Sequence, residues 1–213
     1  MRKALVFVVA VLLLTAGVSI GVLLLRPWPR PPIPNTVAGT SEPVAVDPGG
    51  LPQVFQSDSL GFSIRYPTGW TADTAHRYQA LGPGEDITGV SFTVPTSLAE
   101  GSNLSAGSYL SVEEIPRTDR CTEDLFLPQG TAASDETLDG TPYSVGHVTE
   151  AAVGNRYDET VYAIPGTNPC LAVRYFIHWT VIENYPPGVV TAFDRQSLLD
   201  RLDAIRRTLV IVR

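Results

Sequence analysis

The chain has 213 residues, of which 44% are hydrophobic, and a formal net charge of −7; this length predicts one domain with room for an appendage. The charge is uneven, because eleven basic and all twenty-two acidic residues follow Arg30 and give that portion a net charge of −11. Such an acidic portion argues against binding to nucleic acid and against adhesion to an anionic membrane surface. Lys3 is the only lysine, so enzymes that need a lysine beyond it, such as Schiff-base enzymes, are excluded.

Residues 4–25 form an uncharged, apolar stretch that follows Arg2 and Lys3. As a helix the stretch would be about 33 Å long, which is enough to cross the roughly 30 Å hydrocarbon core of a bilayer. We therefore predict an N-terminal transmembrane helix at residues 4–25, behind a short cytoplasmic N-terminus at residues 1–3. The stretch is longer than the apolar part of a secretory signal, which favours an uncleaved signal-anchor, although cleavage near Ala16 stays open.

Residues 26–53 contain eight of the 18 prolines, and this composition predicts a Pro-rich, disordered tether. Arg26 and Arg30 flank the far end of the apolar stretch and leave its orientation open under the positive-inside rule. The two cysteines favour an outward-facing domain, because disulfides persist in oxidising compartments. The sequence thus predicts a single-pass protein of the cell membrane, in a bacterial envelope, with an extracytoplasmic C-terminal domain. Its predicted lipid partner is the bilayer around residues 4–25.

The chain has two cysteines, Cys121 and Cys170. An even number of cysteines behind a membrane-targeting segment predicts one structural disulfide bond. Two separate buried thiols are the alternative. A pair of zinc ligands is disfavoured, because no CxxC or Cys/His spacing accompanies the cysteines.

The folded domain is predicted at residues 54–213 and opens with a short strand. Phe62, Ile64 and Tyr66 alternate with polar residues, which is the pattern of a half-buried strand. The Pro-Thr-Gly sequence that follows predicts a turn. This turn should fold Trp70 back onto the sheet as a core residue.

Residues 61–70, with the sequence GFSIRYPTGW, resemble the opening strand and turn of domains similar to PsbP and Mog1. Those domains share the pattern aromatic–x–apolar–x–Tyr-Pro-x-x-Trp, and beyond these ten residues the resemblance rests on the order of elements and the closing helix and strand. The resemblance implies an antiparallel sheet flanked by helices. It also implies an accessory or binding role, such as assembly of photosystem II in one specialised case. No metal-binding motif of the family is present, so the resemblance supplies no metal ligand or cofactor.

The sequence of the first half of the domain predicts three further strands and one short helix. The strands are expected at residues 77–81, 88–94 and 109–115, and the helix at residues 122–127. Residues 99–108 are small and polar and predict a loop. This loop contains a glycosylation sequon at Asn103, which we interpret as a chance match.

Residues 141–183 predict a three-stranded meander with turns at Gly154-Asn155 and at residues 166–169. The third strand has an unbroken apolar face and should be the main core strand. That face consists of Leu171, Val173, Tyr175, Ile177, Trp179 and Val181. Residues 191–207 predict an amphipathic helix with a capping box beginning at Thr191, and residues 208–212 predict a final strand. A C-terminal helix covering one antiparallel, meander-rich sheet makes the expected class α+β, in a single domain.

The polar sides of the meander strands supply candidate binding residues. If these sides coincide, His147, Tyr162, Arg174 and His178 cluster on the sheet surface away from the helix. Two histidines with a tyrosine and an arginine would suit an anion, or a metal ion if Asp158 joined them. The alternative is an ordinary solvated face, and the hypothesis fails if the two histidines lie on opposite faces.

The sequence predicts no catalytic, cofactor-binding or metal-binding residue. It contains no HExxH motif and no phosphate-binding glycine loop, and its GxSxG match at residues 17–21 lies inside the predicted membrane helix. We therefore expect a membrane-anchored, extracytoplasmic binding or accessory module that contacts another envelope protein or an extracellular ligand. The alternative is an extracytoplasmic hydrolase or metal-dependent enzyme with a site assembled by the fold. The first predicts an exposed apolar or aromatic patch, and the second a pocket where a histidine meets an acid or hydroxyl.

Overall fold

The computed structural model describes residues 50–212. The predicted transmembrane helix at residues 4–25 and most of the predicted tether at residues 26–53 lie outside the described residues. Within residues 50–212, no helix combines the length and the apolar character needed to cross a membrane. Leu51 is buried in the main core, with 4% of its surface exposed, so the folded part of the chain begins before residue 54.

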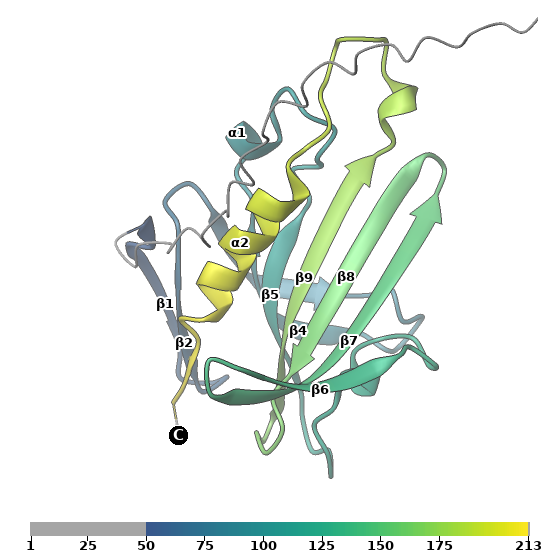
Figure 1. The fold of residues 1–213 in the computed structure, drawn as a ribbon. Coiled ribbons are helices and arrows are strands. Elements are labelled where there is room, and N and C mark those ends of the chain that lie inside the picture. Colours follow the sequence, from purple (N-terminus) through teal and green to yellow (C-terminus); the bar gives the residue numbers. More distant parts are fainter. Residues whose placement is uncertain (1–49, 213) are drawn as a thin grey trace, which may run out of the picture. The chain divides into compact units, whose positions relative to one another are not determined.

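The fold is α+β and contains two antiparallel sheets, with strand orders β1-β2-β10 and β3-β4-β5-β9-β8-β7-β6 (Figure 1). The strands are β1 (Gln53–Ser57), β2 (Phe62–Tyr66), β3 (Thr71–Tyr78), β4 (Ile87–Thr93), β5 (Tyr109–Ile115), β6 (Ala133–Leu138), β7 (Thr141–Ala152), β8 (Asn155–Ala163), β9 (Cys170–Thr180) and β10 (Val210–Ile211). The helical segments are α1 (Thr96–Ala99), η2 (Glu123–Leu125), η3 (Ile182–Asn184) and α2 (Arg195–Arg206). The predicted class and the antiparallel sheet are confirmed. The single sheet is not, because the final strand β10 pairs with β2 in a separate small sheet.

Helix α2 packs across one face of the seven-stranded sheet, which we call the helix face (Figure 1). Apolar residues of α2, at the helical spacing expected from the sequence, join the main core together with the predicted apolar face of β9. Leu171, Val173, Tyr175 and Ile177 of β9 are each at most 2% exposed. Trp70 is also buried in this core, which confirms the predicted turn-back.

The other side of the seven-stranded sheet, which we call the opposite face, carries a second, smaller core. The segment around η2 covers one half of this face, and Phe126 and Leu127 are buried against it. Cys121 and Cys170 lie in the same core with their sulfur atoms 2.11 Å apart and their Cα atoms 5.1 Å apart. The cysteine pair is therefore compatible with the predicted disulfide, which would tie the covering segment to the start of β9.

Several elements differ from the sequence prediction, among them the final strand, which was expected at residues 208–212 and is β10 at Val210–Ile211. The strand expected at residues 77–81 is β3, which begins at Thr71, and β6 was not predicted because its residues are almost all exposed and polar. The α2 helix is capped by Asp194, whose side chain accepts a hydrogen bond from the Ser197 amide at 3.0 Å. The capping box at Thr191 is therefore wrong by three residues.

Asn103 is a structural residue. It is 6% exposed, its side-chain amide donates to the Thr180 carbonyl, and its side-chain oxygen accepts from the Phe193 amide. Both polar atoms of the side chain are thus engaged in holding the loop between α1 and β5 against the end of β9. This burial agrees with the interpretation of the sequon as a chance match.

Replacing both Cys121 and Cys170 by alanine should lower the free energy of unfolding by about 4 kcal/mol, because a 49-residue separation gives a loop-closure term of that size. Urea denaturation of the oxidised protein and of the double variant measures the difference. Reduction of the unchanged protein should produce a loss of similar size. Equal stability of all three samples would mean that the two thiols are not joined.

Replacing Gly89 by alanine should destabilise the domain by about 1–3 kcal/mol, the usual cost of overpacking. A Cβ at this position of β4 would lie 2.2 Å from the Val112 carbonyl oxygen and 2.8 Å from the Glu113 Cα, both backbone atoms of β5. Gly50→Ala is the matched control, because a Cβ there meets nothing within 4 Å. Urea unfolding of both variants tests the expectation, which fails if they are equally stable.

Candidate functional site

The four residues of the predicted ligand face divide between the two sides of the seven-stranded sheet. Directly paired residues of antiparallel strands project to the same side, and Tyr162 pairs with Val173 of the helix face. His147 pairs with Thr160 on that same side, whereas Arg174 and His178 alternate with the buried β9 residues and lie on the opposite face. The predicted cluster is therefore wrong.

His147 and Tyr162 take part in contacts with α2. His147 Nε2 lies 2.9 Å from Asp158 Oδ1, and the guanidinium of Arg195 at the start of α2 binds the other oxygen of the same carboxylate. The ring of Tyr162 lies under the buried Arg206 guanidinium, 4.9 Å from ring centroid to guanidinium carbon. Both residues thus help to hold α2 on the helix face.

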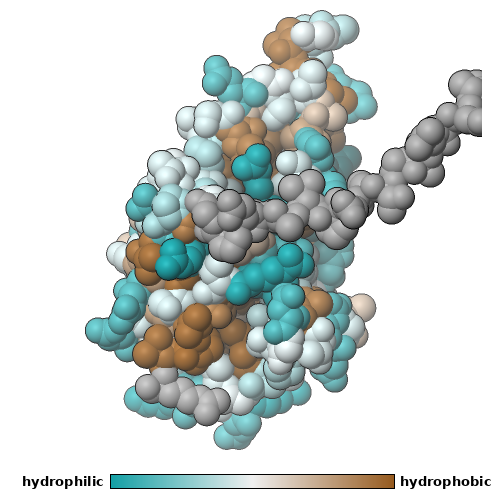
Figure 2. All heavy atoms as spheres, turned by 60° about the vertical axis from the view of Figure 1, so that its left-hand side comes forward, coloured by the Kyte–Doolittle hydropathy of each residue, from teal (hydrophilic) through white to brown (hydrophobic). Residues whose placement is uncertain are grey.

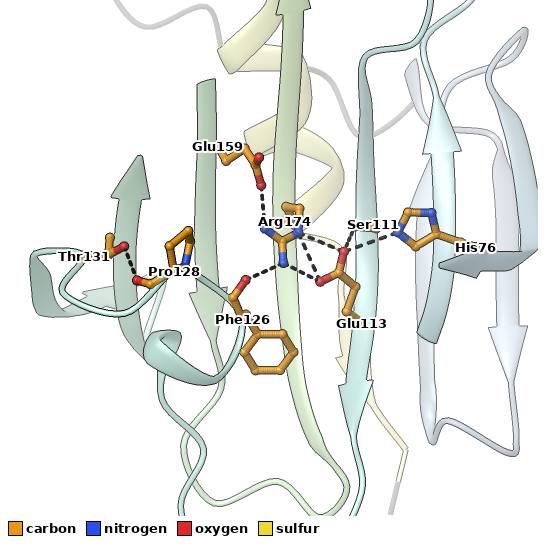
Figure 3. A network of polar contacts seen from close by, with 8 residues as sticks. All are labelled: His76, Ser111, Glu113, Phe126, Pro128, Thr131, Glu159 and Arg174. Atoms are coloured by element: carbon orange, nitrogen blue, oxygen red, sulfur yellow. Dashed lines mark hydrogen bonds and ion pairs between the residues drawn. The ribbon is translucent and has the colours of Figure 1, made fainter. Parts of the chain in front are cut away.

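Arg174 lies at the centre of a buried polar network on the opposite face (Figure 3). Its Nε and Nη2 atoms donate to the two carboxylate oxygens of Glu113, each at 2.9 Å, and its Nη1 donates to Glu159 at 2.6 Å. Nη2 also donates to the Phe126 carbonyl at 2.7 Å, and the ring of Tyr78 lies 3.5 Å from the guanidinium carbon. Strands β3, β5, β8 and β9 and the η2 segment therefore meet at one side chain.

The charges of this network are balanced by close contacts. Burial alone would raise the pKa of Glu113, but the Arg174 charge and hydrogen bonds from His76, Arg174 and Ser111 lower it to about 2. Burial raises the pKa of Glu159 above its usual value, although Arg174 works in the other direction. Within residues 50–212, every buried side-chain nitrogen and oxygen has a hydrogen-bond partner.

Ser111, His76 and Glu113 bring a hydroxyl, an imidazole and a carboxylate together, but not as a nucleophilic triad. The Ser111 hydroxyl donates to Glu113 Oε1 at 2.7 Å, and His76 Nε2 lies 3.3 Å from that same oxygen. A triad requires the hydroxyl to bond to the histidine. Ser111 and Glu113 are also 0% exposed, so the arrangement stabilises the fold and offers no nucleophile to a substrate.

A row of rings stands on the uncovered half of the opposite face, and we call it the aromatic row. It consists of His76, Tyr109, Phe176, Tyr157 and His178, all partly exposed. Tyr109 stacks on Phe176 with ring centroids 4.8 Å apart, and Tyr157 stacks on His178 at 4.6 Å. Contacts of His76 with Tyr109 at 5.0 Å and of Tyr157 with Phe176 at 6.0 Å complete the row. It therefore crosses β3, β5, β9 and β8.

The rings of the aromatic row pack against one another, and each of them is only partly exposed to solvent. Burial lowers the pKa of His178, and its Nε2 lies 3.1 Å from the Asn155 side-chain oxygen. Burial also raises the pKa of Tyr109, and the nearby Glu113 adds to that shift. Both shifts favour the neutral form of the side chain, the imidazole of His178 and the phenol of Tyr109.

The surface of the described residues includes three open depressions. One, of about 720 Å³, lies at the start of β3 and the end of β4 beside the aromatic row, and Thr71, Asp73 and Thr93 help to line it. A second, of about 730 Å³, lies between the β8–β9 loop and β10. Figure 2 shows that apolar residues gather on the side of the molecule that carries β1 and β2. The third, near the start of α2, is smaller. No histidine lines any of the three.

Most of the aromatic row was missed by the sequence argument. His178 was named, and Phe176 was visible as its neighbour on the polar side of β9. Tyr109 and Tyr157 gave no signal, because their places depend on the pairing of β9 with β5 and with β8. Strands β5 and β9 are about sixty residues apart in the sequence. A local sequence pattern cannot predict that two such distant segments pair.

No family model matches the sequence, and no curated protein matches it. Among solved structures, it is similar to the Saccharomyces cerevisiae Ran-binding protein Mog1p, with 16% identity over 75% of this chain and 95% of that one, at a TM-score of 0.45. A single-site mutant of protein Mog1 matches with the same identity and coverage, at a TM-score of 0.44. Both of these structures are Mog1 proteins, and Mog1 is one of the two families that residues 61–70 resemble. The identity and the TM-scores are too low to support any argument about function.

Replacing Glu113 by glutamine should lower the free energy of unfolding at pH 7 by about 3–5 kcal/mol, the cost of breaking a buried ion pair. Because the folded pKa of about 2 lies below the unfolded value, Glu113 stabilises the fold above about pH 5 and loses this effect as the pH falls toward 2. The gap between the two proteins should therefore shrink over that range.

Chemical denaturation at a series of pH values between 2 and 7 measures this gap. Glu150→Gln is the control, since Glu150 is exposed on β7 and its loss should change stability little at any pH. A gap that stays constant down to pH 2 would contradict the assigned role of Glu113.

Proposed function

We propose that this chain is a membrane-anchored, extracytoplasmic binding or accessory module that contacts its partner through the uncovered half of the opposite face. The partner is another envelope protein or an extracellular ligand, and the apolar stretch at residues 4–25 holds the module at the bilayer. The observation that carries the proposal is the aromatic row. An exposed aromatic patch is what the binding hypothesis requires, and the row supports it with partly exposed rings on the half of the opposite face that the η2 segment leaves uncovered.

The chemistry of the aromatic row supports a recognition surface. Tyrosine and phenylalanine supply large contact area with little conformational entropy to lose, and a tyrosine hydroxyl adds a hydrogen bond at the edge. The row also rests on the Arg174 network, since His76 contacts Glu113. A surface that is already fixed before binding loses less entropy on complex formation.

The alternative, a hydrolase or metal-dependent enzyme, has no specific observation in its favour and stays untested. The three histidines of the described residues lie beside Glu113, Asp158 and Asn155. The His147–Asp158 pair lies at the edge of α2 and lines none of the three depressions. A concave pocket in which a histidine meets a nucleophile would be needed to favour this alternative.

A photoreactive phenylalanine analogue placed at Tyr157 should form a discrete crosslinked product in cells that naturally carry the chain. The matched control is the same analogue at Arg156, the neighbouring exposed residue of β8, whose side chain projects to the helix face. Mass analysis of the product from position 157 identifies the partner. A Phe176→Ser change in the same chain should reduce its yield.

Two outcomes would overturn this proposal. One is the absence of any product at position 157, and the other is equal labelling at positions 156 and 157, which would indicate unspecific contact. The folded state of each variant is checked by its urea unfolding midpoint, so that a collapsed sheet is not mistaken for a lost partner.

A further inference from the structure

The depression beside the aromatic row, which we call the threonine depression, is continuous with it in the sheet. Thr71 pairs directly with Thr93, Thr93 pairs with Tyr109, and Tyr109 pairs with Phe176. Directly paired residues project to the same side of an antiparallel sheet. The depression and the row therefore form one surface, which runs from β3 across β4 and β5 to β9.

Four of the ten residues that line the threonine depression carry a hydroxyl group. Its threonines are Thr71, Thr74, Thr93 and Thr96. Three of them are exposed and Thr93 is half-buried, so their hydroxyls are accessible, and each can both donate and accept a hydrogen bond. The remaining lining residues are Asp73 and small or apolar residues, with no arginine, lysine or histidine.

The single charge in the lining is the carboxylate of Asp73. One of its oxygens accepts the Ala75 amide at 2.8 Å, which fixes the side chain at the edge of the depression. A carboxylate with no cationic neighbour in the lining repels anions such as phosphates. Within residues 50–212 no group of three His, Cys, Asp or Glu side chains is placed to hold a metal ion.

We propose that the threonine depression binds a neutral carbohydrate, whose hydroxyls hydrogen-bond to the threonines and Asp73 while its C–H surface contacts Pro95 and Ala106 of the same lining. A volume of about 720 Å³ is in the range of ligand sites. Accessible hydroxyls, one acceptor carboxylate and small apolar side chains match a ligand that is rich in hydroxyls, uncharged and partly apolar. This inference rests on the proposed binding function, and it names neutral carbohydrates as the class of ligand that the opposite face binds.

The test uses the full ¹⁵N-labelled chain in a detergent without sugar headgroups, titrated with maltose, cellobiose and diacetylchitobiose and followed by amide chemical shifts. At least one disaccharide should give saturable shifts at residues 71–74 and 93–96, with a dissociation constant of roughly 1 mM or below. Glucuronic acid, an anionic sugar, should bind more weakly than the neutral probe. Absence of saturable shifts with all three disaccharides, or tighter binding of the anion, overturns the proposal.

Thr93→Val keeps the shape of the side chain and removes its hydroxyl, so it should weaken binding about tenfold, the effect of one lost hydrogen bond. Thr88→Val is the matched control, because Thr88 lies on the same strand but projects to the helix face, paired with Glu114, and it should leave binding unchanged. Equal affinity of the two variants overturns the site.

The two proposals can fail separately. A crosslinked product at position 157 without disaccharide shifts overturns the carbohydrate site and leaves the binding module in place. Saturable disaccharide shifts without any product at position 157 support the carbohydrate site and overturn the contact of a larger partner with the aromatic row.

Discussion

A buried arginine held between two carboxylates is the interaction on which the rest of this fold depends. Removing a guanidinium and two carboxylates from water costs several kcal/mol per ion, and only close pairing offsets that cost. Arg174 meets the requirement because β5 brings Glu113 to one side and β8 brings Glu159 to the other. The same guanidinium binds the Phe126 carbonyl, so the network fixes both the order of the strands and the segment that covers them.

This arrangement gives the opposite face two different halves. One half is closed by the η2 segment, which Arg174 holds at Phe126 and which the cysteine pair holds at the start of β9. The other half carries the aromatic row, which is partly exposed. Recognition surfaces work best when their side chains are held by a rigid layer beneath them. The buried network is such a layer, because charged groups that are fully paired have few alternative arrangements.

The helix face has a contrasting role. Its contacts with α2 combine apolar packing with a second buried arginine, Arg206, which donates to the Tyr175 hydroxyl at 2.9 Å and lies against two tyrosine rings. In these contacts, polar side chains of the helix face stabilise the packing of α2 on the sheet. On the opposite face, the aromatic row and the threonines near it are partly exposed, and the proposed function and the proposed carbohydrate site both use these groups.

The sequence by itself determined the α+β class, the apolar face of β9 and the turn-back of Trp70, because periodicity and turn residues are local signals. Its two cysteines also predicted a disulfide, with which the positions of Cys121 and Cys170 are compatible. The tertiary structure alone decided which polar residues share a face. His147 and His178 were separated because β8 sets the registers of β7 and β9 through pairing, and a side-chain period of two makes every face depend on that register. From the sequence alone, Arg174 would be predicted to lie on the surface. Its burial is favourable because Glu113 and Glu159, on two other strands, pair with its charge.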